Sequence, residues 1–171
     1  MIALLAAVSL LTRHIDPGRS TAAFSVQHIY VERVTGTVPI LSGDVTFDPK
    51  TLLPSAVSAS LDATKIKTDD EDRDAALRSP DWFDTNRFPQ WTFVSTAMTP
   101  TGAQSCTISG LLTIHGVTRP QQLDVAASGS PERPQYKATA HVDRHAFGMS
   151  TARLDPVIGN QVDVTLDVVL E

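Results

Sequence analysis

The chain alternates apolar and polar residues over long stretches, most clearly near its end. Val162, Val164, Leu166, Val168 and Leu170 fall on one face, and the polar residues Gln161, Asp163, Thr165 and Asp167 fall on the other. A period of two is typical of a β-strand that buries one face. The same alternation recurs in residues 22–27, 57–62, 108–114, 123–127 and 136–142. The pattern predicts about eight strands in all.

Turn-forming residues separate these stretches, at residues 16–18, 48–49, 100–102, 128–131 and 158–160. No shift in composition divides the chain, so residues 12–171 are predicted to form one domain. About eight antiparallel strands would leave two open edges unless the sheet closes on itself. The predicted fold is therefore all-β, an antiparallel eight-stranded barrel of the lipocalin-like kind, with one short helical insertion.

The insertion is expected around residues 69–84, where the alternation stops. Asp69 or Asp70 can cap a helix, acidic residues fill the first turn, and Arg78 lies near the expected end. Residues 79–81 read Ser-Pro-Asp, which indicates a second helix start with proline at the first helical position.

Trp82 and Phe83 lie near the end of the insertion and are expected to be its buried anchor, which would plug or gate one end of the barrel. On the inward faces, small residues stand among the large apolar ones. These small residues are Ala22, Ala59, Gly110, Ala127, Ala138 and Ala140. A barrel lined in this way is underfilled, and apolar empty space suits an apolar ligand.

An apolar run of ten residues, 2–11, opens the chain. A bilayer-spanning helix needs about 20 residues, so no integral membrane span is expected. The length fits the apolar part of a secretory signal, which predicts a periplasmic or secreted protein, although no Lys or Arg precedes the run. The alternative is an N-terminal strand or short helix that packs on the domain.

Charge and cysteine content narrow the function classes. The net charge of −5 argues against nucleic acid as a partner, because phosphate binding needs a basic surface. A single cysteine, Cys106, excludes an internal disulfide framework. With no basic residue beside it, Cys106 is interpreted as a small buried hydrophobe and not as a reactive thiol.

One cluster suggests a metal site. His141, Asp143 and His145 would share a face of a strand, as two imidazoles and a carboxylate. The two histidines would however lie about 13 Å apart on a regular strand, at about 3.3 Å per residue. A polar outer face is therefore favoured and no metal is predicted. A metal-dependent hydrolase or isomerase remains the alternative function.

Several segments together resemble the YceI-like family of lipocalin-like, polyisoprenoid-binding proteins. They are IDPGRSTAAFSVQHIYV (15–31), GDVTFDP (43–49), DRDAALRSPDWFDTNRFPQWTFVST (72–96), GLLTIHGVTRP (110–120) and DRHAFGM (143–149). The resemblance implies an eight-stranded barrel that holds an isoprenoid, a quinone-like or a fatty-acyl lipid. It implies binding and not catalysis, and no cofactor beyond that lipid.

Two features depart from the family pattern. Arg19-Ser20 stands where the family often has His-Ser, which is expected to change headgroup contacts near the mouth. Trp82-Phe83 replaces two phenylalanines and keeps a bulky plug. Residues 111–120, LLTIHGVTRP, are interpreted as a hairpin in which Gly116 supplies backbone freedom. The alternative is that His115 or Arg119 reaches the polar end of a ligand.

The predicted ligand-binding residues combine an apolar lining with two polar groups, His28 and Arg73. The apolar members are Phe24, Val26, Trp82, Phe83, Ile108, Leu112, Ile114 and Val125. Arg73 has a structural alternative, an ion pair beneath the helix. A partner-binding accessory protein and a homodimer are also left open.

Overall fold

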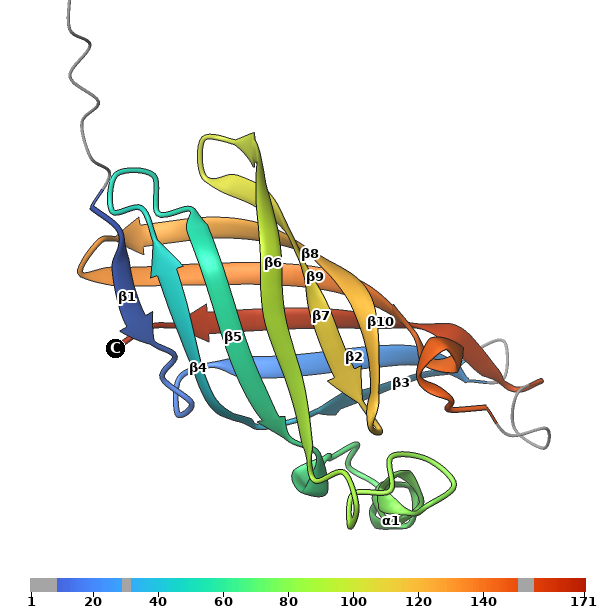
Figure 1. Cartoon of the computed structure of the whole chain (residues 1–171). Helices are drawn as coiled ribbons and strands as arrows, with labels where there is room; N and C mark the ends of the chain where they lie inside the picture. Colours follow the sequence, from blue (N-terminus) through green and yellow to red (C-terminus); the bar gives the residue numbers. More distant parts are fainter. Residues whose placement is uncertain (1–8, 29–31, 151–155) are drawn as a thin grey trace, which may run out of the picture.

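The computed structural model describes residues 9–28, 32–150 and 156–171 (Figure 1). Within these residues ten strands form one antiparallel sheet, in the order β1-β4-β5-β6-β7-β8-β9-β10-β2-β3. The strands are β1 (Leu11–His14), β2 (Thr21–His28), β3 (Glu32–Thr37), β4 (Ile40–Phe47), β5 (Pro54–Asp62), β6 (Gln90–Gly102), β7 (Ser105–Ile114), β8 (Val117–Ser130), β9 (Arg133–Asp143) and β10 (Ile158–Val169). The helices of the described segments are α1 (Glu71–Arg78) and two 3₁₀ turns, η2 (Ala63–Lys65) and η3 (Arg144–Phe147).

The sheet curls on itself, so that β4, β5 and β6 cross in front of β9, β10 and β2 (Figure 1). Ile15 fastens one end of the curl. It forms an antiparallel bridge with Leu170, and its N–H donates to the Gly43 carbonyl at 2.9 Å. The N–H of Asp16 also donates to the carbonyl of Val169, at 2.9 Å. These contacts of Ile15 and Asp16 hold the two sides of the curled half-barrel together at this end, which is called the laced end below.

The predicted all-β antiparallel barrel is confirmed, but the described residues form ten strands and not about eight. The additional elements lie at the edges of the sheet. β1 has four residues, and β3 buries only Val34. Only Val38 and Pro39 separate β3 from β4. Edge strands bury little side-chain area, so they lack the alternation on which the prediction relied.

Two of the predicted turns are confirmed, at residues 16–18 and 48–49. Two others lie slightly later than predicted: β6 continues through Gly102 before a turn at residues 103–104, and β8 continues through Ser130 before a turn at residues 131–132. The fifth is wrong, because residues 158–160 begin β10. In that last segment the register between β10 and β2 shifts, between Ile158 and Val162. Gly and Pro mark an irregularity in an edge or bent strand as readily as they mark a turn.

LLTIHGVTRP forms the predicted hairpin. β7 ends at Ile114, β8 begins at Val117, and the two residues between them both have positive φ, 53° at His115 and 71° at Gly116. Two such residues are the signature of a tight hairpin turn whose twist matches the strands. Arg119 lies within β8, and its Nε donates to the Ala146 carbonyl at 3.1 Å.

The helical insertion is confirmed as α1, with Asp70 as its N-cap. The Asp70 side chain accepts from the Arg73 N–H at 2.9 Å. The second helix expected at residues 79–81 is wrong, because turns occupy this segment. Its backbone instead bonds to the end of α1, and the Asp84 N–H donates to the Ser79 carbonyl at 2.9 Å.

Most of the apolar N-terminal run, residues 2–8, lies outside the described residues. Leu11 is the first residue of β1, one position before the predicted domain start. No helix in the described part of the chain is long and apolar enough to cross a membrane.

Candidate functional site

The curled sheet encloses an inner chamber of about 160 Å³. Its wall is almost entirely apolar, because the inward positions of eight strands carry aliphatic and aromatic side chains. Val57, Leu61, Ile108, Leu112, Val125 and Leu166 are among them. The polar exceptions are Gln121 and Tyr136. The Tyr136 hydroxyl donates to the Leu52 carbonyl at 2.9 Å and is therefore not available inside the chamber.

An outer chamber of about 280 Å³ lies beneath α1 and the turn that follows it. Its lining includes Val26 and His28 from β2, and Leu77, Trp82 and Phe83 from the insertion. The two chambers adjoin, since they share five lining residues. These shared residues are Phe24, Trp91, Ile114, Val142 and Val164.

Small residues keep the inner chamber open. Ala22, Ala59, Ala138 and Ala140 all line it, as the alternation predicted. Gly110 has the same effect indirectly, because a Cβ there would lie 2.4 Å from Cζ of Phe93. The Phe93 ring thus occupies the space of a missing side chain and stays close to the wall.

A cavity with such a wall is suited to apolar ligands. An engineered cavity of about 150 Å³ lined by Leu, Ile and Phe stays dry and takes up benzene. The inner chamber has a similar volume and a similar lining. The second chamber extends this space toward solvent, so an elongated ligand fits better than a compact one.

Polar side chains stand where the outer chamber meets solvent. The His28 side chain is 33% exposed, and its Nδ1 lies 3.9 Å from Oε2 of Glu32. The Arg73 side chain is 37% exposed and lies 3.9 Å from the Asp70 carboxylate. Its Nε also donates to Oγ1 of Thr68 at 2.8 Å. Arg73 thus has the structural contacts of the alternative interpretation and also lines the chamber.

A buried carboxylate fixes α1 to the segment that precedes it. Asp74 accepts from the Thr68 N–H at 2.8 Å and from the Thr68 hydroxyl at 2.6 Å. Both residues are buried, at 7% and 6% exposure. This contact positions the helix, and with it the lid of the outer chamber.

Arg144 is a buried lining residue that sequence reasoning missed. Its guanidinium donates to the carbonyls of Met149 at 2.6 Å, Gly159 at 3.0 Å and Ile158 at 3.0 Å. Its Cζ lies 6.0 Å from the centre of the Trp82 ring. A charged residue in the polar run DRH gives no sequence signal of burial, because its partners are main-chain groups.

All ten predicted ligand-binding residues line one chamber or both. Phe24 and Ile114 line both chambers. The inner chamber has Ile108, Leu112 and Val125. The outer chamber has Val26, His28, Arg73, Trp82 and Phe83. Their contact with a ligand stays a prediction.

Trp91 and Phe93 are lining residues that the prediction omitted. They alternate in the segment QWTF, but the later apolar residues Val94 and Met98 fall out of phase with them, and the strand was not recognised. Gln121 was also missed. Its Nε2 donates to the carbonyls of His141 and Gln122, each at 3.0 Å. This bond joins β8 to β9 beyond Asp124, where their ladder of paired residues stops.

Arg19 lines neither chamber, and its expected effect on headgroup contacts stays a prediction. Arg19 lies in the turn before β2, and its Nε is 2.5 Å from the Asp16 carboxylate. The outer chamber lies at the other end of β2, around Val26 and His28. Ser20 is buried, and its hydroxyl accepts from the Val169 N–H at 3.0 Å, so this pair belongs to the laced end.

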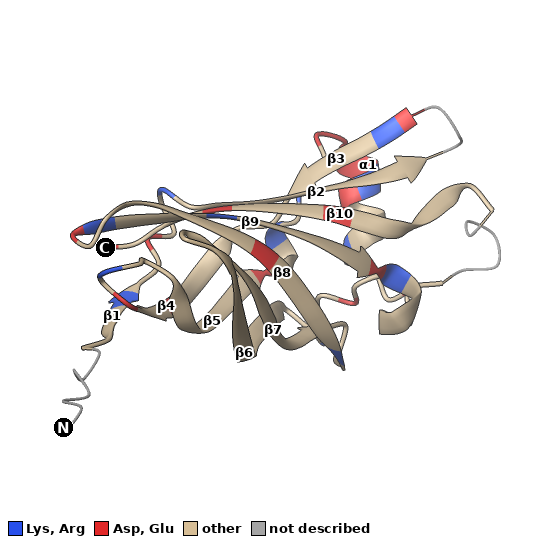
Figure 2. Ribbon diagram, turned by 90° about the horizontal axis from the view of Figure 1, so that it is seen from above, with Lys and Arg blue, Asp and Glu red and all other residues tan. Residues whose placement is uncertain are grey.

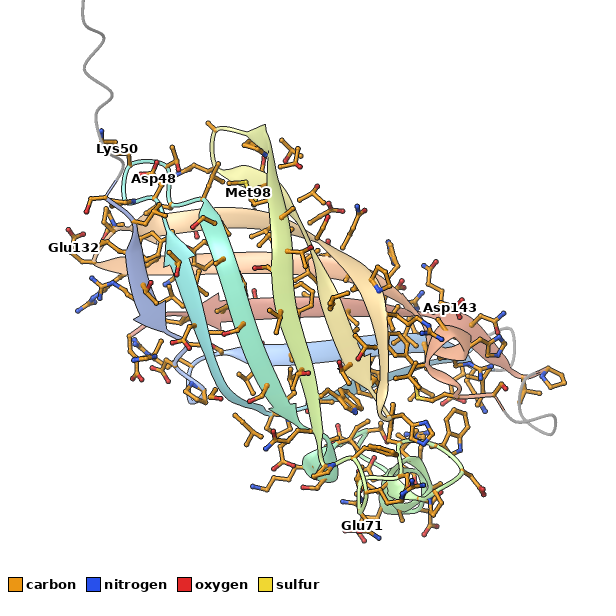
Figure 3. All side chains as sticks on the ribbon, in the orientation of Figure 1. Asp48, Lys50, Glu71, Met98, Glu132 and Asp143 are labelled. Atoms are coloured by element: carbon orange, nitrogen blue, oxygen red, sulfur yellow. The ribbon has the colours of Figure 1, made fainter. Side chains whose placement is uncertain are left out.

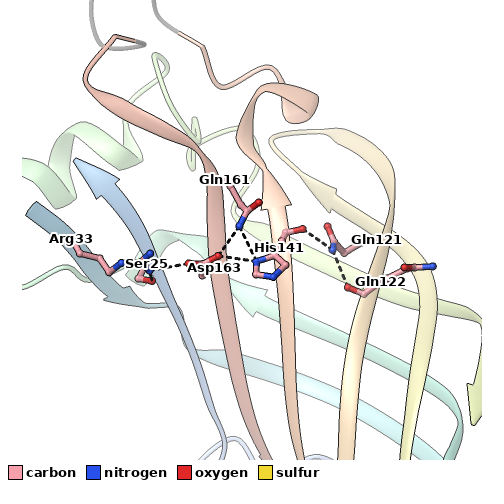
Figure 4. Close-up of polar contacts among 7 residues, drawn as sticks. All are labelled: Ser25, Arg33, Gln121, Gln122, His141, Gln161 and Asp163. Atoms are coloured by element: carbon pink, nitrogen blue, oxygen red, sulfur yellow. Dashed lines mark hydrogen bonds and ion pairs between the residues drawn. The ribbon is translucent and has the colours of Figure 1, made fainter. Parts of the chain in front are cut away.

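The histidines of the metal alternative do not converge. His141 lies on the outer face, with Nδ1 at 2.8 Å from Oδ1 of Asp163 (Figure 4). Asp143 instead accepts from the His145 N–H at 2.9 Å and caps η3. Among the described residues no group of three or more His, Cys, Asp or Glu side chains could hold a metal ion.

Asp163 is the centre of this outer network. Hydrogen bonds from Arg33 at 2.8 Å, from Gln161 at 3.1 Å and from His141 lower the pKa of Asp163 to about 2. The Arg33 guanidinium also donates to the Ser25 hydroxyl at 2.6 Å (Figure 4). The network ties β3, β2, β10 and β9 together on the outside of the barrel.

Charged residues stand mainly at strand ends and loops, and most of the strand length is uncharged (Figure 2). Asp48, Lys50 and Glu132 mark the laced end, while Glu71 and Asp143 lie toward the α1 end (Figure 3).

Cys106 is 1% exposed, and burial raises the pKa of its thiol, which confirms its interpretation as a buried hydrophobe.

An antiparallel sheet curled around an apolar two-part cavity defines a lipocalin-like barrel. The chain belongs to the YceI-like domain family, whose sequence profile matches residues 14–170. It is 29% identical over 154 residues to a UPF0312 protein of Vibrio parahaemolyticus, covering 86% of this chain and 78% of that one. It is 34% identical over 111 residues to Protein YceI of Shigella flexneri, covering 65% of this chain and 58% of that one.

Solved structures share the fold. BcnA of Burkholderia cenocepacia superposes with a TM-score of 0.82 at 22% identity, over 91% of this chain and 98% of that one. A polyisoprenoid binding domain from Saccharophagus degradans superposes with a TM-score of 0.67 at 16% identity, over 95% of this chain and 99% of that one.

Proposed function

We propose that the chain binds an isoprenoid or a similar amphiphilic lipid, unchanged, inside the two chambers. The observation that carries the proposal is the continuity of an apolar inner chamber with an outer chamber that ends at His28 and Arg73. An apolar chain fits the first, and a polar headgroup fits the exposed end of the second. Membership in the YceI-like family and the fold shared with a polyisoprenoid binding domain support the proposal.

Burial of the lipid's hydrocarbon chain supplies ample binding free energy. At about 0.8 kcal/mol per buried methylene, a five-carbon isoprenoid unit gains about 4 kcal/mol before ordering costs. A long chain would then pass the limit of about −20 kcal/mol that real complexes reach. Ordering and incomplete burial must offset the excess. Chain length is therefore selected by the depth of the cavity and by the Trp82-Phe83 pair.

Carriage or storage of the lipid in the periplasm or outside the cell completes the proposal. The apolar run of residues 2–11 supports export. Fractionation of the native host with a periplasmic marker enzyme tests this part. Recovery of the chain with the cytoplasmic marker would refute the location and leave lipid binding to be judged on its own.

The first experiment is native mass spectrometry of the protein purified from its own host, followed by solvent extraction and lipid analysis. One co-purifying prenyl or acyl lipid per chain is the expected result. Ala138→Leu is expected to abolish it, because Ala138 is 4% exposed and lines the inner chamber. The matched control is Thr139→Leu, the next residue of β9, which points outward and is expected to retain the lipid.

A protein that is purified from its host without lipid and takes up no lipid in vitro would refute the proposal. Equal lipid content in both variants would place the lipid outside the chambers. Circular dichroism of both variants establishes that the fold is unchanged.

A further inference from the structure

Trp91 occupies the boundary between the two chambers. It is one of the residues that line both of them, and it lies at the start of β6, opposite Leu61 of β5. Only 9% of Trp91 is exposed. Its ring packs against the ring of Phe83, with centroids 4.6 Å apart. A lipid chain that passes from the outer to the inner chamber must therefore pass the indole of Trp91.

The indole N–H of Trp91 is a buried donor without an acceptor. Within the described part of the chain, Nε1 is the one buried side-chain nitrogen or oxygen that has no hydrogen-bond partner. Buried donors are nearly always satisfied, and leaving one unsatisfied destabilises a protein. Such an exception at a cavity wall calls for a partner from outside the chain.

Water is a poor candidate for that partner. A buried water molecule needs two to four polar neighbours. The other residues that line both chambers are Phe24, Ile114, Val142 and Val164, all apolar. A bound lipid can instead bring its own acceptor to the junction, while its chain supplies the apolar contacts.

We propose that Trp91 selects lipids that carry an uncharged acceptor oxygen, a carbonyl above all, at the boundary between headgroup and chain. The inference rests on the proposed function and adds the chemistry of the ligand at one depth. The acceptor is uncharged because the walls at the junction are apolar, and an anion there would lose its hydration without a compensating cation. The outer chamber then holds the headgroup, and the inner chamber holds the chain.

The approach to Nε1 requires a small local movement, since the atom is covered by its neighbours. Phe83 can make room, because it belongs to the turn after α1 and not to the sheet, and it is only partly buried. The main chain of this turn is held to α1 by a bond from the Phe83 N–H to the Leu77 carbonyl, at 3.0 Å. Rotation of the side chain leaves that bond intact.

The test compares two probes, farnesylacetone and the matching hydrocarbon in which a methylene group replaces the carbonyl. Dissociation constants are measured for the wild type, for Trp91→Phe and for Trp82→Phe by displacement of a fluorescent fatty acid. The wild type is expected to bind the ketone about tenfold more tightly than the hydrocarbon, the effect of one hydrogen bond in an apolar site. Trp91→Phe keeps an aromatic ring and is expected to lose this preference. Trp82→Phe, in the outer chamber, is expected to keep it.

A second measurement does not depend on the folding of a variant. The chain has two tryptophans, so its proton–nitrogen correlation spectrum has two indole signals. The ketone is expected to move the Trp91 signal downfield, and the hydrocarbon is not.

The outcomes separate this inference from the proposed function. If both probes bind with equal affinity to the wild type, or if Trp91→Phe retains the preference, the selection by Trp91 is refuted and lipid binding stands. If neither probe binds, the proposed function fails and this inference fails with it.

Discussion

The hydroxyl of Tyr136 donates to the carbonyl of Leu52, at 2.9 Å and across 84 residues of sequence. Tyr136 belongs to β9, whereas Leu52 lies in the turn between β4 and β5. Leu52 has a positive φ of 64°, which is unusual for a residue with a side chain, and it is only 4% exposed. The bond therefore fixes this strained turn over one end of the inner chamber.

Tyr136→Phe removes this bond and leaves the buried Leu52 carbonyl without its donor. We expect a loss of about 1–3 kcal/mol in the free energy of unfolding, measured by chemical denaturation. The control is Thr118→Val, which removes an exposed hydroxyl contact of 2.8 Å with Thr113. Its effect is expected to stay within about 0.5 kcal/mol. Equal losses in both variants would mean that the end is not held by Tyr136.

Gly110→Ala places a methyl group against the Phe93 ring, at 2.4 Å from Cζ, and at 2.5 Å from the Val94 carbonyl oxygen. Something must shift, and the ring can move only toward the inner chamber. We expect a loss of about 1–3 kcal/mol in stability and weaker binding of a fluorescent fatty acid.

Gly159→Ala is the matched control, because the nearest atom to its Cβ is 3.4 Å away. Unchanged fatty-acid affinity in Gly110→Ala would contradict the view that Phe93 borders the binding space.

Asp163 gives the protein a defined pH dependence. Its pKa is about 2 in the folded chain, against 3.8 without the hydrogen bonds from Arg33, Gln161 and His141. The folded state therefore holds its proton less tightly than the unfolded state. The stabilisation is complete above pH 3.8 and disappears as the pH falls toward 2.

The Asp163 side chain is 35% exposed, so solvent screening limits its contribution to at most about 1 kcal/mol. Asp163→Asn is expected to lower stability by that amount at pH 7 and to match the wild type near pH 2. Urea denaturation of both proteins across this range is the measurement. A difference that does not change with pH would mean that the charge of Asp163 plays no part.

Asp74→Ala removes the carboxylate oxygen, Oδ1, that accepts both hydrogen bonds from Thr68, and it is expected to loosen α1. Hydrogen bonds to a buried carboxylate contribute about 1.5–3 kcal/mol, and the loss should appear as faster amide exchange in residues 71–78. The control is Asp72→Ala in the same first turn. That side chain is exposed, and its removal should cost at most about 1 kcal/mol through the helix dipole. Unchanged exchange in Asp74→Ala would show that the helix is held by other contacts.

How far the sequence predicts the structure depends on how each residue is stabilised. The β10 face of Val162, Val164 and Leu166 was predictable, because burial on one side of a strand imposes a period of two. The helix start at Asp70 was predictable, because capping is a local interaction. β3 was not, since an edge strand is held by its partner's main chain and its own side chains carry little of the pattern.

The residues of the candidate cavity also divide into those whose environment follows from a local pattern and those held by distant partners. Its apolar wall, from Phe24 to Val125, follows from alternation and was found. Gln121 and Arg144 were not, because their partners are carbonyls that only the folded chain brings near. Trp91 was missed because the strand that carries it was not recognised. The absence of an acceptor for its indole N–H also leaves no local pattern in the sequence.

The contacts at the laced end have a consequence for how a ligand enters and leaves the barrel. Among the described residues, the contacts of Ile15 and Tyr136 hold this end of the barrel together, whereas the outer chamber lies at the other end, beneath α1. A long lipid that entered through the outer chamber, as proposed above, would go in tail first and come out headgroup first. A membrane or enzyme that receives such a molecule would therefore meet its headgroup before its tail.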